Sequence, residues 1–167
     1  MIDKLLLEKY LALRAEVDKL CNQLLAVHAK HLECKKGCSS CCMNFSIFPI
    51  EFFAIKHFFN GLSPEIATFV AGEACKFLVN DACTIYDHRP IICRTQGLPL
   101  LFTGDEGWEL SACELNFANF DFSEFDVENT FPHDKFNSKL YLLNNEYLES
   151  LAGNRVKSEE LVELRLL

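Results

Sequence analysis

The sequence contains no uninterrupted apolar stretch approaching the roughly 20 residues that a membrane-spanning helix needs. Its first residues, Met1 to Lys4, lead into a charged periodic segment and not into the apolar core of a signal peptide. We therefore expect a cytoplasmic protein with no membrane partner.

Basic side chains are also scarce. Sixteen lysines and arginines face twenty-four aspartates and glutamates, and the formal net charge is −8. Proteins bind phosphate backbones mainly through Lys and Arg. The charge balance therefore argues against nucleic acid as a partner.

The sequence has no internal repeat, no low-complexity tract and none of the composition of a disordered chain. Half of the 167 residues are hydrophobic and fifteen are Phe, which is typical of a globular protein. The length suits one domain with a modest hydrophobic core. We expect residues 1–167 to form a single domain.

Recognisable catalytic constellations are missing. The sequence shows no Ser/His/Asp set, no phosphate-binding glycine loop and no carboxylate pair at a familiar spacing. What it has in excess is cysteine, with nine residues. Thiols stay mostly reduced in the cytoplasm, so metal binding explains their number better than a disulfide framework does.

Helical periodicity marks both ends of the chain. From Leu6 to His31, apolar residues recur at alternating spacings of four and three, which predicts a long N-terminal helix within residues 1–32. The same pattern from Phe136 to Leu151 predicts a C-terminal helix over residues 134–152. We expect a further acidic helix in the last ten residues.

Three residues of the N-terminal helix need a separate interpretation. Cys21 lies beside the apolar stripe and is expected to be a small buried hydrophobe, not a metal ligand. His28 and His31 are expected to be packed and hydrogen-bonded in the core, and they are only reserve ligands.

The middle of the chain predicts short elements. Turn-forming residues favour a loop over residues 33–48, and a helix is expected from Pro49 to about Asn60. Ser63 is a candidate N-cap for another helix that ends near Glu73. Alternation and turn residues then predict two hairpins, over residues 75–86 and 98–112, followed by an ordered loop over residues 114–133. The expected fold class is mainly α with small β-hairpins, a cysteine-rich metal-binding core flanked by long N- and C-terminal helices.

The cysteines between residues 33 and 113 are the candidate metal ligands. Thiolates bind zinc tetrahedrally, and cysteines two to four residues apart can reach one ion because a tight turn brings their sulfurs together. Cys41 and Cys42 are adjacent, and their side chains are expected to diverge. Eight sulfurs allow two four-cysteine sites, one site with spare thiols, or a polynuclear centre. The candidate ligands are Cys34, Cys38, Cys41, Cys42, Cys75, Cys83, Cys93 and Cys113.

The spacing of these cysteines and the residues between them resemble the pattern of a known protein family. The first cluster, then Cys75-Lys-Phe-Leu, then Cys83-Thr-Ile-Tyr-Asp-His-Arg-Pro-Ile-Ile-Cys93-Arg94 and finally Cys113 resemble the CxxCxxCC family of zinc- or iron-chelating domains, also called the YkgJ family. The resemblance covers residues 34 to 113. The sequence departs from the family pattern at one place, where three residues and not two separate Cys34 from Cys38, so Cys34 is the weakest candidate of the first cluster. Related domains occur in flagellin lysine-N-methylases.

Three residues between or next to Cys83 and Cys93 have predicted roles of their own. Pro90 fixes the backbone between Cys83 and Cys93, while Arg89 and Arg94 place positive charge near thiolates. Each arginine is equally compatible with a structural ion pair, for instance with Asp87.

Three functional hypotheses follow. The first is a metal-binding protein whose cysteines hold zinc or iron, an iron–sulfur cluster included, and which presents this centre to a protein partner. The second is an iron–sulfur oxidoreductase or a protein-modifying transferase related to the lysine-N-methylases, with a protein substrate. The third is a metal chaperone or sensor, favoured if one site exchanges its ion readily and another does not.

Overall fold

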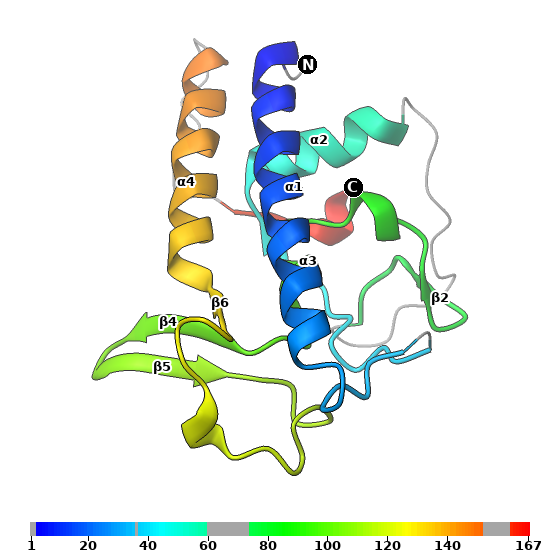
Figure 1. Cartoon of the computed structure of the whole chain (residues 1–167). Helices are drawn as coiled ribbons and strands as arrows, with labels where there is room; N and C mark the ends of the chain where they lie inside the picture. Colours follow the sequence, from blue (N-terminus) through cyan, green and yellow to red (C-terminus); the bar gives the residue numbers. More distant parts are fainter. Residues whose placement is uncertain (1–2, 36, 60–73, 152–160) are drawn as a thin grey trace.

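The computed structural model describes residues 3–35, 37–59, 74–151 and 161–167 (Figure 1). The predicted helix from Ser63 to Glu73 lies outside these residues. The helices and strands, in chain order, are α1 (Lys4–Val27), β1 (Ser46–Ile47), α2 (Pro49–Phe59), β2 (Leu78–Val79), β3 (Ala82–Cys83), η1 (Tyr86–His88), α3 (Ile91–Thr95), β4 (Leu100–Gly104), β5 (Gly107–Ser111), η2 (Phe122–Glu124), β6 (Phe131–Pro132), α4 (His133–Ser150), β7 (Val162–Glu163) and η3 (Leu164–Leu166).

Helix α1 begins at a local cap and ends ahead of a long-range contact. The carboxylate of Asp3 accepts the backbone N–H groups of Leu5 and Leu6 at 2.9 and 3.3 Å, as a helix N-cap does. The helix ends at Val27, so the prediction that it continues to His31 is wrong. The His31 carbonyl instead accepts the N–H of Phe117 at 2.8 Å, which ties the chain after the helix to the 114–130 segment.

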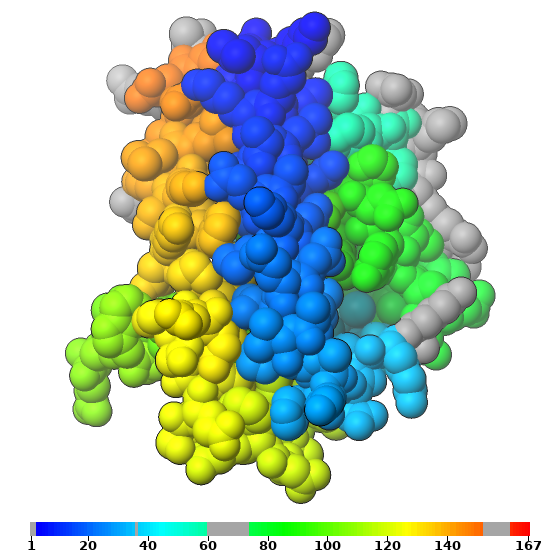
Figure 2. Space-filling model, in the orientation of Figure 1, coloured from blue at the N-terminus to red at the C-terminus, as the bar shows by residue number. Residues whose placement is uncertain are grey.

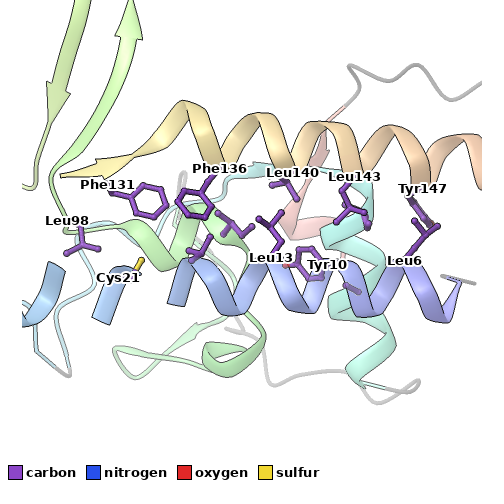
Figure 3. Packing of buried hydrophobic residues seen from close by; sticks show 14 of the residues in the cluster. Leu6, Tyr10, Leu13, Cys21, Leu98, Phe131, Phe136, Leu140, Leu143 and Tyr147 are labelled. Atoms are coloured by element: carbon purple, nitrogen blue, oxygen red, sulfur yellow. The ribbon is translucent and has the colours of Figure 1, made fainter. Parts of the chain in front are cut away.

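Helices α1 and α4 lie side by side and enclose most of the core (Figures 1 and 3). The predicted C-terminal helix is thus present, with boundaries close to the expected ones. Burying a large apolar side chain stabilises the fold by about 1.5–3 kcal/mol, so this seam is a main source of stability. The seam is formed by Leu6, Tyr10, Leu13, Val17, Cys21 and Leu24 of α1 with Phe136, Leu140, Leu143, Tyr147 and Leu148 of α4.

Helix α2 begins at Pro49 as predicted and buries two faces. Ile50 belongs to the α1–α4 core, and Ile55 belongs to a second apolar cluster around Phe77. Glu51 is buried between the two, where its carboxylate accepts the N–H of Phe48 at 3.3 Å and the N–H of Ile91 at 2.8 Å. This one side chain therefore caps both α2 and α3. Burial raises the pKa of Glu51 to about 7.

Three small sheets complete the fold. The β2–β3 hairpin turns at Asn80 and Asp81, which both have positive φ, as the tightest hairpin turns require. Strands β4 and β5 form the second predicted hairpin, which projects from the body of the protein (Figure 2), and β6 joins it parallel to β4. Strand β7 pairs with β1, so residues 162–163 are a strand and the predicted acidic helix in the last ten residues is wrong there.

The expected fold class is confirmed in part. Helices dominate and the small hairpins are present, but the described residues form a mixed α/β fold with pairings, β1–β7 and β4–β6, that join distant segments. The long helices also pack against each other, and the cysteine loop follows the C-terminal end of α1 instead of lying between them (Figure 1). No helix of the described residues is long and apolar enough to cross a bilayer.

Candidate metal centre

The first cysteine cluster lies on a loop made of successive tight turns. The N–H of Cys38 donates to the carbonyl of Lys35, and the N–H of Cys42 donates to the carbonyl of Ser39, both at 2.9 Å. Gly37 has a φ of 96°, which a residue with a side chain rarely adopts. The loop predicted from the sequence is therefore present, and its turns bring the cysteines of this segment close together.

By their electrostatic neighbours the eight candidate ligands fall into two groups of four that are linked to each other at Cys41 and Cys42. The thiol of Cys34 interacts with three other cysteines, and we name this group the outer set: Cys34, Cys38, Cys41 and Cys113. The thiols of Cys42 and Cys93 both interact with Cys75 and Cys83, and we name these four the inner set: Cys42, Cys75, Cys83 and Cys93. Two four-cysteine sites fit this grouping, and a joint centre fits the link between Cys41 and Cys42.

Three structural elements assemble the inner set. The N–H of Cys75 donates to the carbonyl of Cys42 at 3.1 Å, which joins the first loop to the β2–β3 hairpin. Cys83 lies on β3 opposite Leu78, and Cys93 lies on α3. Burial, then Cys75, Glu51 and Cys83, raise the pKa of Cys93 to about 12. A bound cation would reverse this preference, because metal-bound thiols lose their protons.

The two sets meet at Cys41 and Cys42. A hydrogen bond between their thiols, with Cys42 as the donor, lowers the pKa of Cys41 to about 6 and raises that of Cys42. The sequence predicted that these side chains diverge, and the hydrogen bond corrects that expectation. The electrostatic neighbours of the two thiols still differ, so adjacent residues can serve different sets.

The outer set depends on residues that the sequence did not single out. The side-chain amide of Asn116 donates to the sulfur of Cys34 at 3.2 Å and to the carbonyl of Gly97 at 2.7 Å. Gly97 has a φ of 91°, and a Cβ there would lie 3.0 Å from the Cys34 sulfur. Cys34 is thus held beside Gly97 and Asn116 although it is exposed. Nothing in the local sequence of Asn116 signals this contact, because it joins residues 82 positions apart.

A cavity of about 370 Å³ borders the outer set. Cys41 and Cys113 lie in its wall, together with leucines and two serines. A second cavity, of about 280 Å³, lies beside β1, α3 and α4 and touches no cysteine. The residues around the first cavity are Ser40, Cys41, Gln96, Gly97, Leu98, Leu100, Ser111, Ala112, Cys113, Glu114 and Leu115.

Arg89 and Arg94 have different roles. Arg94 is buried and donates to both carboxylate oxygens of Asp18 at 2.6 and 2.8 Å, and to the carbonyls of Arg89 and Asp87 at 2.8 and 2.7 Å. It is therefore a structural link between α1 and the segment before α3. Arg89 stacks on Tyr86 at 4.0 Å and lies within electrostatic reach of Cys41, Cys83 and Cys93. Arg89 therefore favours thiolates in both sets, and Lys76 does the same for Cys75.

The remaining cysteine and the two histidines lie apart from this centre. Cys21 is buried between the helices, and burial raises its pKa to about 11, so it packs as predicted. His28 is buried, and its Nε2 lies 2.6 Å from the carbonyl oxygen of Asn129. His31 contacts Phe117 and Phe120. His28 is thus packed and hydrogen-bonded as expected, whereas His31 is half-buried against the two phenylalanine rings.

Among the described residues, no three Cys, His, Asp or Glu side chains stand close enough together to hold an ion as they lie. The donor set nevertheless suits zinc and iron in its chemistry, because thiolates are soft ligands that both metals accept. Binding would draw the sulfurs toward an ion at about 2.3 Å.

Comparison with known proteins gives one match. Residues 33–114 match the model of the CxxCxxCC family, described as "Putative zinc- or iron-chelating domain". No curated protein and no solved structure matches the chain. The matched segment contains all eight candidate ligands and excludes Cys21. Residues 33–114 of this chain therefore belong to the CxxCxxCC family.

Proposed function

We propose that this chain is a metal-binding protein that holds two ions of zinc or iron, one in each set of four cysteines. The observation that supports this function is the separation of eight thiols into two groups of four, each with the ligand number of a Zn(Cys)₄ or iron–sulfur site. Arg89 between the sets offsets part of the negative charge, which for Zn(Cys)₄ is about −2 per site.

Metal binding in this protein is coupled to folding. The inner set joins the first cysteine loop, the β2–β3 hairpin and α3, which hydrogen bonds and the second apolar cluster already bring together. An ion there would cross-link these three elements and stabilise the folded state relative to the unfolded chain. Residues 1–167 act as one domain in this proposal, because α3 and the cysteine loop both depend on contacts with α1 and the 114–130 segment.

Elemental analysis with an absorption spectrum tests the function. The chain is purified without oxygen and without added metal, and zinc, iron and acid-labile sulfide are measured per chain. About two ions of zinc or of iron per chain, without labile sulfide, support the proposal of one ion in each set. A colourless zinc protein favours structural or partner-binding sites, whereas iron with labile sulfide and a broad band near roughly 400 nm indicates an iron–sulfur centre and a redox or transferase role. A well-folded protein that binds neither metal contradicts the proposal.

A further inference from the structure

The three-stranded sheet has one protected edge and one open edge. Its strands are ordered β5-β4-β6, so β6 and β5 form the two edges. Strand β6 is two residues long, contains Pro132, which has no N–H to donate, and leads directly into α4. Strand β5 pairs with β4 in an uninterrupted register, and among the described residues no strand pairs with its outer side. Alternate residues of β5 therefore direct their backbone N–H and C=O groups away from β4 without a strand partner.

The open edge is accessible to other molecules. The β4–β5 hairpin projects from the body of the protein (Figure 2), and four of the five residues of β5 are exposed. One of them is Trp108, the single tryptophan of the chain, which is 73% exposed. Tryptophan is enriched in binding hot spots, where a partner covers the ring. Natural proteins commonly protect an edge with lysine, proline or a bulge, and β5 has none of these.

The charge around this edge is of one sign. Residues 95–134 contain nine Asp and Glu and no Lys or Arg, whereas the rest of the chain has sixteen basic and fifteen acidic residues. Four of the nine lie on β5 or within three residues of its ends, and all four are exposed. Among the described residues, none of the four forms an ion pair with a lysine or arginine. The four are Asp105, Glu106, Glu109 and Glu114.

We propose that the outer edge of β5 binds an extended basic segment of a protein partner, which adds a strand to the sheet. Successive side chains of a strand lie on opposite faces, so Glu109 and Trp108 recognise different residues of the segment. The segment therefore alternates Lys or Arg, on the face of Glu109, with β-branched or aromatic residues, on the face of Trp108 and Leu110. Strand β5 ends at Ser111 in the wall of the 370 Å³ cavity, where Glu114 extends the acidic surface. This interaction involves no cysteine and does not rest on the proposed function.

Charge disfavours the other molecules that could occupy this edge. A second copy of the chain would pair β5 with β5 and bring identical carboxylates together, and like charges on paired strands are destabilising. Nucleic acids and anionic membranes would be repelled by the same carboxylates. A basic polypeptide satisfies the backbone groups, the aromatic ring and the charge together.

Tryptophan fluorescence tests this inference, because Trp108 is the only tryptophan and reports directly on the edge. The full-length chain, as purified, is titrated at low ionic strength with a blocked peptide of alternating lysine and valine. We expect a saturable change in emission. The same peptide with its central valine replaced by proline should bind about tenfold more weakly, because proline lacks the N–H that pairs with a neighbouring strand. A peptide of alternating glutamate and valine should not bind.

Variants of the chain locate the binding. Glu109→Lys should weaken binding of the lysine–valine peptide about tenfold, equivalent to about 1.4 kcal/mol, because attraction is replaced by repulsion. Trp108→Ala, measured by calorimetry, should weaken it by a similar factor. Glu149→Lys makes the same change of charge at an exposed position in the last turn of α4 and should have little effect. Circular dichroism checks that each variant is folded.

Three results would overturn the inference. The first is the absence of saturable binding of the lysine–valine peptide. The second is equal weakening by Glu109→Lys and Glu149→Lys, or undiminished binding of the proline peptide, which would indicate a non-specific attraction of cations. The third is a dimer in native mass spectrometry that Trp108→Ala dissociates, which would assign the edge to a second copy of the chain.

Discussion

Asn116 connects Cys34 to Gly97: its amide donates to the sulfur of one and to the carbonyl of the other, at 3.2 and 2.7 Å. The oxygen of the same side chain accepts the N–H of Glu33 at 2.8 Å. Asn116 is itself buried and its partners Cys34 and Glu33 are exposed, so these bonds are partly shielded from water. One amide therefore fixes the start of the cysteine loop on the turn before β4.

This contact predicts the effect of Asn116→Ala. The substitution removes the hydrogen bond that favours the Cys34 thiolate, and loss of such a support for a metal ligand typically lowers affinity about 10- to 100-fold. Competitive titration of Zn²⁺ with a chromophoric chelator should show weaker binding of one ion and unchanged binding of the other. Asn119→Ala, at an exposed position nearby, is the control. Equal weakening of both ions would contradict the assignment of Asn116 to the outer set.

The two arginines predict opposite phenotypes. Arg94→Met breaks a pair whose arginine is 7% exposed and whose Asp18 is 40% exposed, so we expect a loss of about 3 kcal/mol, the lower end for buried pairs. Arg89→Met leaves stability nearly unchanged but removes the cation beside Cys41, Cys83 and Cys93, and should weaken metal binding. Denaturant unfolding and zinc titration of both variants check this. Similar effects of the two substitutions on both measurements would contradict the division of roles.

Glu51 predicts a pH dependence of stability. Its pKa is raised from 4.5 to about 7 in the folded state, so the folded protein keeps a proton that the unfolded chain releases between these values. The contribution of Glu51 is therefore fully present below pH 4.5 and is lost as the pH rises through 7, by up to about 3 kcal/mol.

Glu51→Gln removes this titration. The variant loses one acceptor for the N–H groups of Phe48 and Ile91 and should be less stable by about 1–3 kcal/mol at acidic pH. Its stability should then fall less than that of the wild type between pH 4.5 and 7. The measurement is the difference in free energy of unfolding between the two proteins across this range, with the exposed Glu149→Gln as the control. A difference that does not change with pH would contradict the assignment.

The family segment is expected to depend on the rest of the chain. A fragment of residues 33–114 lacks α1, α4 and Asn116, and with them the partners of Arg94, Ile50 and Cys34. We expect it to show little cooperative unfolding and to bind zinc more weakly than the full chain, by circular dichroism and competitive titration. Native affinity of the isolated fragment would show that residues 33–114 are an autonomous unit.

Local patterns in the sequence predicted α1, α2, α4 and both hairpins, but not the short helix α3. The apolar spacing located α1 and α4, Pro49 located the start of α2, and Asn80 and Asp81 located the β2–β3 turn. The errors lie where distant segments decide the structure. The carbonyl of His31 pairs with Phe117 outside any helix, and residues 162–163 pair with β1, and neither contact has a local signal.

The sequence likewise identified the candidate ligands. It did not indicate which of them lie near one another. Spacing alone places Cys41 and Cys42 in one cluster, whereas the structure gives them different neighbours across the fold. The cavity and the support from Asn116 depend on the same long-range packing. Only the assembled chain therefore shows which cysteines lie near one another.

Native mass spectrometry of the zinc-loaded protein tests the two-set arrangement most directly. The wild-type chain should carry two ions, and Cys113→Ser, folded by circular dichroism, should carry one; Cys93→Ser should also carry one, and the double variant none. A single polynuclear centre predicts instead that Cys113→Ser loses both ions. That result, or two ions retained in Cys113→Ser, would contradict the assignment of the eight cysteines to two sets.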